Sequence, residues 1–258
     1  MRGSVAWITI APVKALGLVQ RDDVLLERSG VRENRRFYLV DDEGRMVNGK
    51  TMGPLVRVLP DYDEAAGTLA LRLPDGATVA AEVALGEHLT TSFFGRPVAG
   101  RLVEGPWSGV LSEIASRPLR LVQTERLGDG ADRGSGAGVS LVGTASLEAL
   151  AEAAGVGHVD GRRFRMLFGV DGVPAHAEDE WVGRDVRIGE ALVRPRGNVG
   201  RCAVTTQNPE TGVPDLDTLR VLGEYRGEVE TTERLPFGVW GMVLEPGRVR
   251  LGDPVQPE

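Results

Sequence analysis

Short apolar or alternating runs, separated by turn residues, dominate the first third of the chain, and this pattern restricts the fold more than any other feature of the sequence. Alternation with a period of two residues predicts β-strands. The predicted strands are VAWITI (5–10), RFYLV (36–40), LALRL (69–73) and ATVAAEVAL (77–85). Turns are predicted at 41–44 and 74–76, where Gly44 and Gly76 can adopt a positive φ.

The rest of the chain adds more strands and a few helices. Helices are predicted at Glu87–Phe94, Gly109–Ser116, 144–154 and Asp217–Arg226. Further strands are predicted at LRLVQ (119–123), RMLFGV (165–170), DVRIG (185–189), ALVRP (191–195), VWGMVLE (239–245) and RVRLGDPV (248–255). Because strands and helices do not alternate regularly, the sequence predicts a mainly β (α+β) fold, with a largely antiparallel barrel or sandwich.

Charge and composition exclude several classes of protein. The net charge of −7 argues against a nucleic-acid partner, because phosphate backbones require a basic surface. No apolar run approaches the roughly eighteen residues that span a bilayer, so no membrane association is expected. The N-terminal sequence lacks the pattern of a signal peptide. A single cysteine fits a reducing compartment, and we expect a cytoplasmic protein.

The glycine-rich segment Gly128–Gly138 (GDGADRGSGAG) is the most flexible part of the chain by composition. Its alternate glycines suggest a dinucleotide-binding loop, but the G-x-G-x-x-G pattern is absent. We therefore interpret the segment as a mobile loop.

Cys202, the single cysteine, is the main candidate for chemistry. It follows Arg201 within RGNVGRCAVTTQNPETG (196–212), whose Gly, Asn, Pro and Thr residues predict an irregular loop. A neighbouring guanidinium favours the thiolate, which is a nucleophile and a ligand for soft metals. The alternative is that Cys202 is simply a small buried apolar residue.

Other sites that use cysteine lack the necessary partners. The sequence contexts of the three histidines, His88, His158 and His176, do not single out a base for a cysteine nucleophile. One cysteine and three scattered histidines show no zinc-binding spacing, and an iron–sulfur cluster needs several cysteines. A ligand that brings its own metal and most of its coordination would need only one protein thiolate.

Lysine is rare in this chain, since only Lys14 and Lys50 are lysines among the 30 basic residues. A GC-rich genome explains the preference for arginine. A lysine retained at position 14 still hints that this position requires a compact ammonium group.

Several separated motifs resemble one family along the whole chain. The segments RCAVTTQNPETG (201–212), DGRRFRMLF (160–168), AEDEWVGRDVRIG (177–189) and PFGVWGMVLEPGRVRLGDPV (236–255) resemble the MOSC domain, named for the C-terminal part of molybdenum-cofactor sulfurase. The segments APVKALG (11–17) and NRRFYLVDDEG (34–44) resemble the MOSC N-terminal β-barrel domain. The resemblance implies a β-barrel-like domain at 1–116 and a MOSC β-barrel domain at 117–258.

The resemblance also implies a cofactor and the residues that bind it. In the related amidoxime-reducing proteins, the cysteine of the R-C motif binds molybdenum, and the matching residue here is Cys202. The resemblance implies that six further residues hold the anionic molybdenum cofactor (molybdopterin): Lys14, Arg36, Thr144, Ser146, Arg165 and Arg201. Arginine, lysine and helix N-termini suit a phosphate-bearing pterin. Pyridoxal phosphate binding is a further property attached to the family.

The sequence departs from the family pattern at several positions. Ala11 and Ala15 replace an aromatic residue and a serine, and Met166–Leu167 replaces Pro-Asn. These changes remove polar groups near the expected pocket. The acidic run at 178–180 is interpreted as a solvated turn.

The leading hypothesis is the one that the resemblance implies: an oxidoreductase with a molybdenum cofactor held by Cys202, which reduces N-hydroxylated or other N-oxygenated small molecules. Its electrons would come from a separate protein of the ferredoxin or flavoprotein type. Two alternatives stay open, a sulfur carrier that uses a persulfide on Cys202 and a non-catalytic relative that binds a pterin or another anion.

Overall fold

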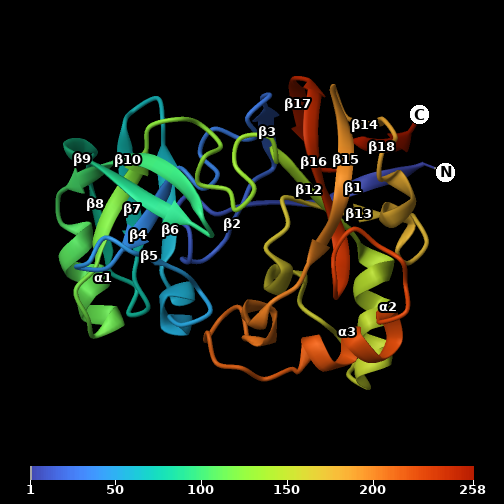
Figure 1. Cartoon of the computed structure of the whole chain (residues 1–258). Helices are drawn as coiled ribbons and strands as arrows, with labels where there is room; N and C mark the ends of the chain where they lie inside the picture. The colour runs from blue at the N-terminus through green and yellow to red at the C-terminus, as the bar shows by residue number, and fades with distance from the viewer. Residues whose placement is uncertain (1) are drawn as a thin grey trace.

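The large sheet of this protein closes into a seven-stranded barrel, which fills the half of the molecule that contains both chain ends (Figure 1). The computed structural model describes residues 2–258. The strand order is β13-β12-β16-β15-β14-β18-β1, and pairing of β1 with β13 closes the ring. The strands are β1 (Gly3–Ile10), β12 (Val139–Gly143), β13 (Phe168–Asp171), β14 (Val186–Ile188), β15 (Ala191–Gly200), β16 (Pro236–Glu245) and β18 (Pro254–Pro257).

The barrel interior is apolar because alternate residues of each strand point inward. Ile8, Phe168 and Val239 are fully buried in this core. Two helices, α2 (Thr144–Ala154) and α3 (Thr218–Arg226), pack through Leu150 and Leu222 into a second apolar cluster. The short strand β2 (Val19–Gln20) extends the sheet beside β1.

The other half contains two smaller antiparallel sheets and one α-helix (Figure 1). The five-stranded sheet consists of β5 (Met46–Val47), β4 (Phe37–Val40), β11 (Arg120–Thr124), β10 (Arg96–Glu104) and β9 (Ala84–Phe93). The three-stranded sheet consists of β6 (Leu59–Asp63), β7 (Thr68–Arg72) and β8 (Thr78–Glu82). The helix α1 (Trp107–Ala115) buries Trp107 against them, and the indole Nε1 donates to the Leu69 carbonyl. The strands β3 (Asp23–Leu26) and β17 (Gly247–Arg250) form a separate ribbon.

The predicted mainly β fold with few helices is confirmed, including the predicted helices that became α1, α2 and α3. The helix predicted at Glu87–Phe94 is wrong, because residues 87–93 belong to β9, in which His88–Phe93 pair with Arg96–Arg101 of β10, and Phe94 lies in the turn that follows. Thr90 and Thr91 favour the extended conformation, and Thr91 and Phe93 are buried on the face of β9 that packs inward. The proposed division at residue 116 stays a prediction.

Candidate functional site

A cavity of about 220 Å³ lies where the two halves meet, and residues from both halves line it. The first half contributes Lys14, Arg35, Lys50 and Phe94 to the wall. The barrel half contributes Arg165, Arg201, Cys202 and Trp240. The glycine-rich segment 128–138 supplies Asp132 and Arg133. The cavity therefore joins the only cysteine to an unusual concentration of positive charge.

Lys14 is the most buried of these cations. Its side chain is 11% exposed, and its ammonium forms an ion pair with Asp132 and donates to the Gly130 carbonyl. Desolvation lowers the pKa of Lys14, the Asp132 carboxylate acts in the opposite direction, and Arg35 reinforces the lowering. Asp132 is 59% exposed, so this neutralising group lies at the cavity mouth.

Arg35 and Arg165 lie on opposite halves of the molecule and meet at this cavity. The guanidinium of Arg35 donates to the Arg165 carbonyl at 3.4 Å, and that of Arg165 donates to the Leu16 carbonyl at 2.8 Å. Desolvation and the nearby Arg35 lower the pKa of Arg165 to about 10. Both arginines have a left-handed backbone, with φ of 54° and 52°. Such strained residues persist where the surrounding structure requires them, and they are common at functional sites.

Cys202 is half-buried and begins the 3₁₀ turn η4 (Ala203–Thr206). Its carbonyl accepts hydrogen bonds from the backbone N–H and the hydroxyl of Thr205, both at 3.0 Å. Thr205 Oγ1 also contacts Thr218 Oγ1 at 2.6 Å. These bonds connect the backbone of Cys202 to helix α3 without using its thiol, and Cys202 is a free cysteine in the cavity wall.

Arg201 has a different role from the one expected of a charge beside a thiolate. Its guanidinium donates to the carbonyls of Phe164 and Phe237 and contacts the Met166 sulfur at 3.0 Å. Desolvation lowers the pKa of Arg201 to about 9, while the nearby Cys202 acts in the opposite direction. Arg201 thus ties the strand before Cys202 to two neighbouring backbone segments.

The predicted site residues divide into two groups. Lys14, Arg165, Arg201 and Cys202 line the cavity together. Arg36, Thr144 and Ser146 do not line it. The Arg36 guanidinium instead donates to the carbonyl of Thr124 in the neighbouring strand. Arg35, one residue earlier, is the arginine of this segment that reaches the cavity.

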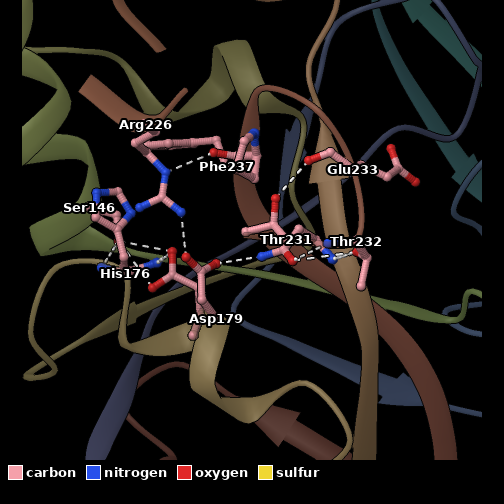
Figure 2. A network of polar contacts seen from close by, with 12 residues as sticks. Ser146, His176, Asp179, Arg226, Thr231, Thr232, Glu233 and Phe237 are labelled. Carbon is pink, nitrogen blue, oxygen red and sulfur yellow. Dashed lines mark hydrogen bonds and ion pairs between the residues drawn. The ribbon is translucent and has the colours of Figure 1, made fainter. Parts of the chain in front are cut away.

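Thr144 and Ser146 belong to the first turn of α2, where Figure 2 shows Ser146 close to His176. Thr144 Oγ1 donates to Asp171 at 2.8 Å. The Ser146 hydroxyl lies 2.9 Å from Glu178 Oε1 and accepts from the His176 N–H at 2.8 Å. The Gly143 N–H also donates to Glu178, so this carboxyl caps the N-terminus of α2.

The interpretation of 178–180 as a solvated acidic turn is wrong for Glu178. This residue is fully buried, and burial raises its pKa, although hydrogen bonds from Gly143 and Ser146 partly offset the effect. The helix end requires an acceptor at this point, which explains a carboxyl group in the interior. Glu180 is the exposed member of the run.

The same network continues to the strand before Cys202 (Figure 2). Asp179 forms an ion pair with Arg226 and accepts from Asn198 Nδ2 at 2.7 Å. The Asn198 N–H donates to the Thr232 hydroxyl, and the Gly200 N–H donates to Glu233. These polar contacts therefore hold β15 as far as Gly200, the residue before Arg201.

Several cavity residues were not predicted from the sequence as site residues, including Arg35, Lys50, Phe94 and Asp132. The rarity of lysine was the one available signal, and both lysines of the chain line the cavity. The sequence offered no sign of Arg35, since its position depends on a left-handed backbone.

The fold and the site define a β-rich protein whose two halves enclose a cavity lined by cations and one cysteine, an arrangement whose charge suits an anionic ligand. Two family models match this chain in order, the MOSC N-terminal beta barrel domain over residues 2–101 and the MOSC domain over residues 130–256. The chain therefore belongs to the MOSC family, as a MOSC domain protein with the N-terminal β-barrel domain.

Known proteins align with nearly the entire chain. The mitochondrial amidoxime-reducing component 1 of Xenopus laevis is 29% identical over 98% of this chain and 81% of its own length. The protein of the same name from Mus musculus is 27% identical over 98% of this chain and 82% of its own. The crystal structure of the YUAD protein from Bacillus subtilis covers 99% of this chain and 94% of its own, with 11% identity and a TM-score of 0.46.

Two further observations concern the described residues alone. Within residues 2–258, no helix is long and apolar enough to cross a membrane. Across the same part of the chain, no three His, Cys, Asp or Glu side chains converge to form a metal site. The expected cytoplasmic location stays a prediction.

Proposed function

We propose that this protein is a molybdenum-cofactor oxidoreductase that reduces N-hydroxylated or other N-oxygenated small molecules. One observation carries the proposal: a single cavity brings the Cys202 thiol together with Lys14, Arg35 and Arg165. The match to MOSC models and the likeness to amidoxime-reducing components support the same class of activity.

The residues present fit the cofactor chemically. Six cationic residues line the cavity (Lys14, Arg35, Lys50, Arg133, Arg165 and Arg201), and Asp132 is the one acidic residue among the described lining residues. A bound anionic ligand would therefore neutralise part of a net positive charge. A bound dithiolene-bearing pterin supplies most of the metal coordination and the two-electron reduction of an N–O group. Cys202 would complete the coordination as a thiolate.

The chain's own residues then bind, orient and exclude water. Lys14, Arg35 and Arg165 hold an anionic group in surroundings of low water content, where their charges are least screened. The hydrogen bonds from Thr205 fix the position of the Cys202 backbone, and Arg201 fixes the strand before it. A thiol that is held in one position requires little rearrangement when it binds a metal.

The proposed reaction needs electrons that this chain does not supply by itself. The conversion of an N-hydroxylated group to the parent amine or amidine consumes two electrons and two protons and releases water. We propose a separate electron-donor protein of the ferredoxin or flavoprotein type as their source.

Metal analysis of wild type beside Cys202→Ser tests the proposal. Both proteins should be produced in a host that makes molybdenum cofactor. We expect near-equimolar molybdenum in wild type, reduced or labile metal in the variant, and loss of turnover. Wild type without molybdenum from such a host would contradict the proposal.

A sulfur carrier is the second candidate function, because Cys202 is a free thiol in an accessible cavity. Intact-protein mass spectrometry separates the two functions. An added sulfur on Cys202 in molybdenum-free protein supports the carrier, and stoichiometric molybdenum excludes it.

A further inference from the structure

Phe94 is an exposed aromatic residue in a backbone conformation that aromatic residues rarely adopt. It has a φ of 51° and is 63% exposed. With Gly95, whose φ is 89°, it forms the two-residue turn between β9 and β10, since Phe93 pairs with Arg96. Two positive φ values in such a turn favour Asn-Gly. The turn alone therefore does not explain a phenylalanine at this position.

The position of Phe94 supplies a reason. Its side chain belongs to the cavity wall. A residue that keeps an unfavourable backbone conformation at the mouth of a cavity is a candidate for a functional side chain. An exposed phenyl ring offers a flat apolar face on which another ring can stack.

Lys50 lies beside this ring. Its ammonium is 5.9 Å from the centroid of Phe94, and it lines the same cavity. No ion pair joins Lys50 to a carboxylate among the described residues, whereas Lys14 is already paired with Asp132. Lys50 is thus an exposed cation without an internal partner at the cavity mouth.

The loop that carries Lys50 also contacts the turn that begins at Cys202. Gln207 Nε2 donates to the Gly49 carbonyl at 3.0 Å and lies 3.4 Å from that of Lys50. Lys50 and Phe94 are therefore part of the wall that a substrate approaching Cys202 would pass.

We propose that Phe94 and Lys50 select aromatic substrates that carry an anionic group, with the ring on Phe94 and the anion on Lys50. The inference rests on the proposed function for the reaction, but the recognition follows from these two side chains. Stacking should favour an aromatic ligand by about three- to tenfold. An exposed ion pair should favour the anion by up to about fivefold.

Binding measured by calorimetry on cofactor-loaded protein tests the recognition without turnover. The probes are benzoate, cyclohexanecarboxylate and benzamide. Wild type should bind benzoate more tightly than either of the others. Phe94→Asn suits the turn, so we expect it to fold with a Tm at least equal to that of wild type and to lose the preference for benzoate over cyclohexanecarboxylate.

Lys50 is tested with the same probes. Lys50→Met should lose the preference for benzoate over benzamide, and Lys50→Arg should keep it. Both variants should retain the molybdenum content of wild type. Leu85→Asn is the matched control, because Leu85 is an exposed apolar residue of β9 outside the cavity wall, and it should change neither preference.

Three results would overturn the inference: wild type without either preference, Phe94→Asn that keeps the ring preference, or Lys50→Met that loses molybdenum. The last result would make Lys50 a cofactor ligand. Protein that binds molybdenum and shows both preferences but reduces no N-oxygenated compound would refute the proposed function and leave this recognition standing.

Discussion

At the scale of single residues, the cavity collects charges that the protein does not neutralise internally. Desolvation lowers the pKa of Lys14, Arg35 and Arg165. Keeping these three side chains charged without a bound anion therefore lowers the stability of the folded protein. Asp132 relieves part of this cost from the mouth, where it is 59% exposed. Because Asp132 is exposed, we expect an anion that enters the cavity to compete with it for Lys14.

Asp132→Asn should therefore bind inorganic pyrophosphate more tightly than wild type. The substitution removes a competing negative charge, and for an exposed carboxylate we expect about a two- to fivefold gain at low salt. Calorimetry of the cofactor-free proteins measures this change. Asp61→Asn is the control, because Asp61 pairs with Arg21 outside the cavity wall. An equal gain in both variants would show that only net charge matters.

His176 makes stability depend on pH in a defined direction. Desolvation, with a smaller effect of Arg226, lowers the pKa of His176 to about 4, against 6.5 for the free side chain. The unfolded chain takes up this proton first as pH falls, so stability is lost between pH 6.5 and 4. The pKa of Glu178 is raised, so the folded chain takes up this proton first as pH falls, and the contribution of Glu178 to stability increases.

The contribution of His176 is the difference between wild type and His176→Asn, which keeps the left-handed backbone at φ 61°. We expect wild type to lose about 1–2 kcal/mol more than the variant over this range, after allowing for partial solvent screening of the histidine. Urea unfolding at pH 7 and pH 4.5 measures this loss. Parallel pH profiles of the two proteins would contradict it.

At the scale of elements, helix α2 depends on a residue that lies outside it. Gly143, at the N-cap, has no side chain to accept the free N–H groups of the first turn. Glu178 accepts from Gly143 and Ser146 instead, from a 3₁₀ turn (Ala177–Trp181) more than thirty positions later. The cap therefore connects the helix to the segment whose next residue, Asp179, supports β15.

Glu178→Ala should destabilise the protein by about 2–4 kcal/mol, because two buried donors lose their acceptor. Glu178→Gln should cost less, since its side-chain carbonyl still accepts one of these bonds. Chemical denaturation gives both values. Glu180→Ala, at the exposed neighbour, should stay within about 0.5 kcal/mol of wild type. A similar loss in all three variants would refute the capping role.

At the scale of the whole molecule, the two halves fit closely enough to act as one body. Gly53 and Gly212 meet across the junction, and a Cβ on Gly53 would lie 2.2 Å from the Gly212 carbonyl oxygen. The Arg165–Leu16 and Gln207–Gly49 hydrogen bonds cross the same junction. A ligand in the cavity therefore contacts both halves and should stabilise them together.

Gly53→Ala should lower the Tm by several degrees and weaken pyrophosphate binding, since the backbone of one half must move away from the other. Differential scanning calorimetry with and without the anion measures both effects. Gly109→Ala is the matched control, because nothing lies within 4 Å of a Cβ at this helical position. It should leave stability unchanged or raise it by up to about 1 kcal/mol. Equal Tm values for Gly53→Ala and wild type would contradict this account of the junction.

Local sequence patterns predicted most strands and three helices, because alternation and capping depend on neighbouring residues. The closure of the barrel by β1 and β13 could not be predicted this way, since it joins residues as distant as Ser4 and Asp171. The family resemblance selected Lys14 and Cys202, which line the cavity, but it selected Arg36 in place of Arg35, whose left-handed backbone decides its direction. Glu178 was misjudged for a similar reason: only the folded chain brings the end of α2 to it.

The pairing of β1 with β13 and β18 has a consequence for the protein during its synthesis. The first strand leaves the ribosome long before its partners, since Gly3 pairs with Val255. Until then, apolar residues such as Ile8 have no barrel to enter. The small sheets of the other half can form earlier from consecutive hairpins. The ring, and with it the cavity wall that contains Cys202, can close only after β18 (Pro254–Pro257) has been synthesised.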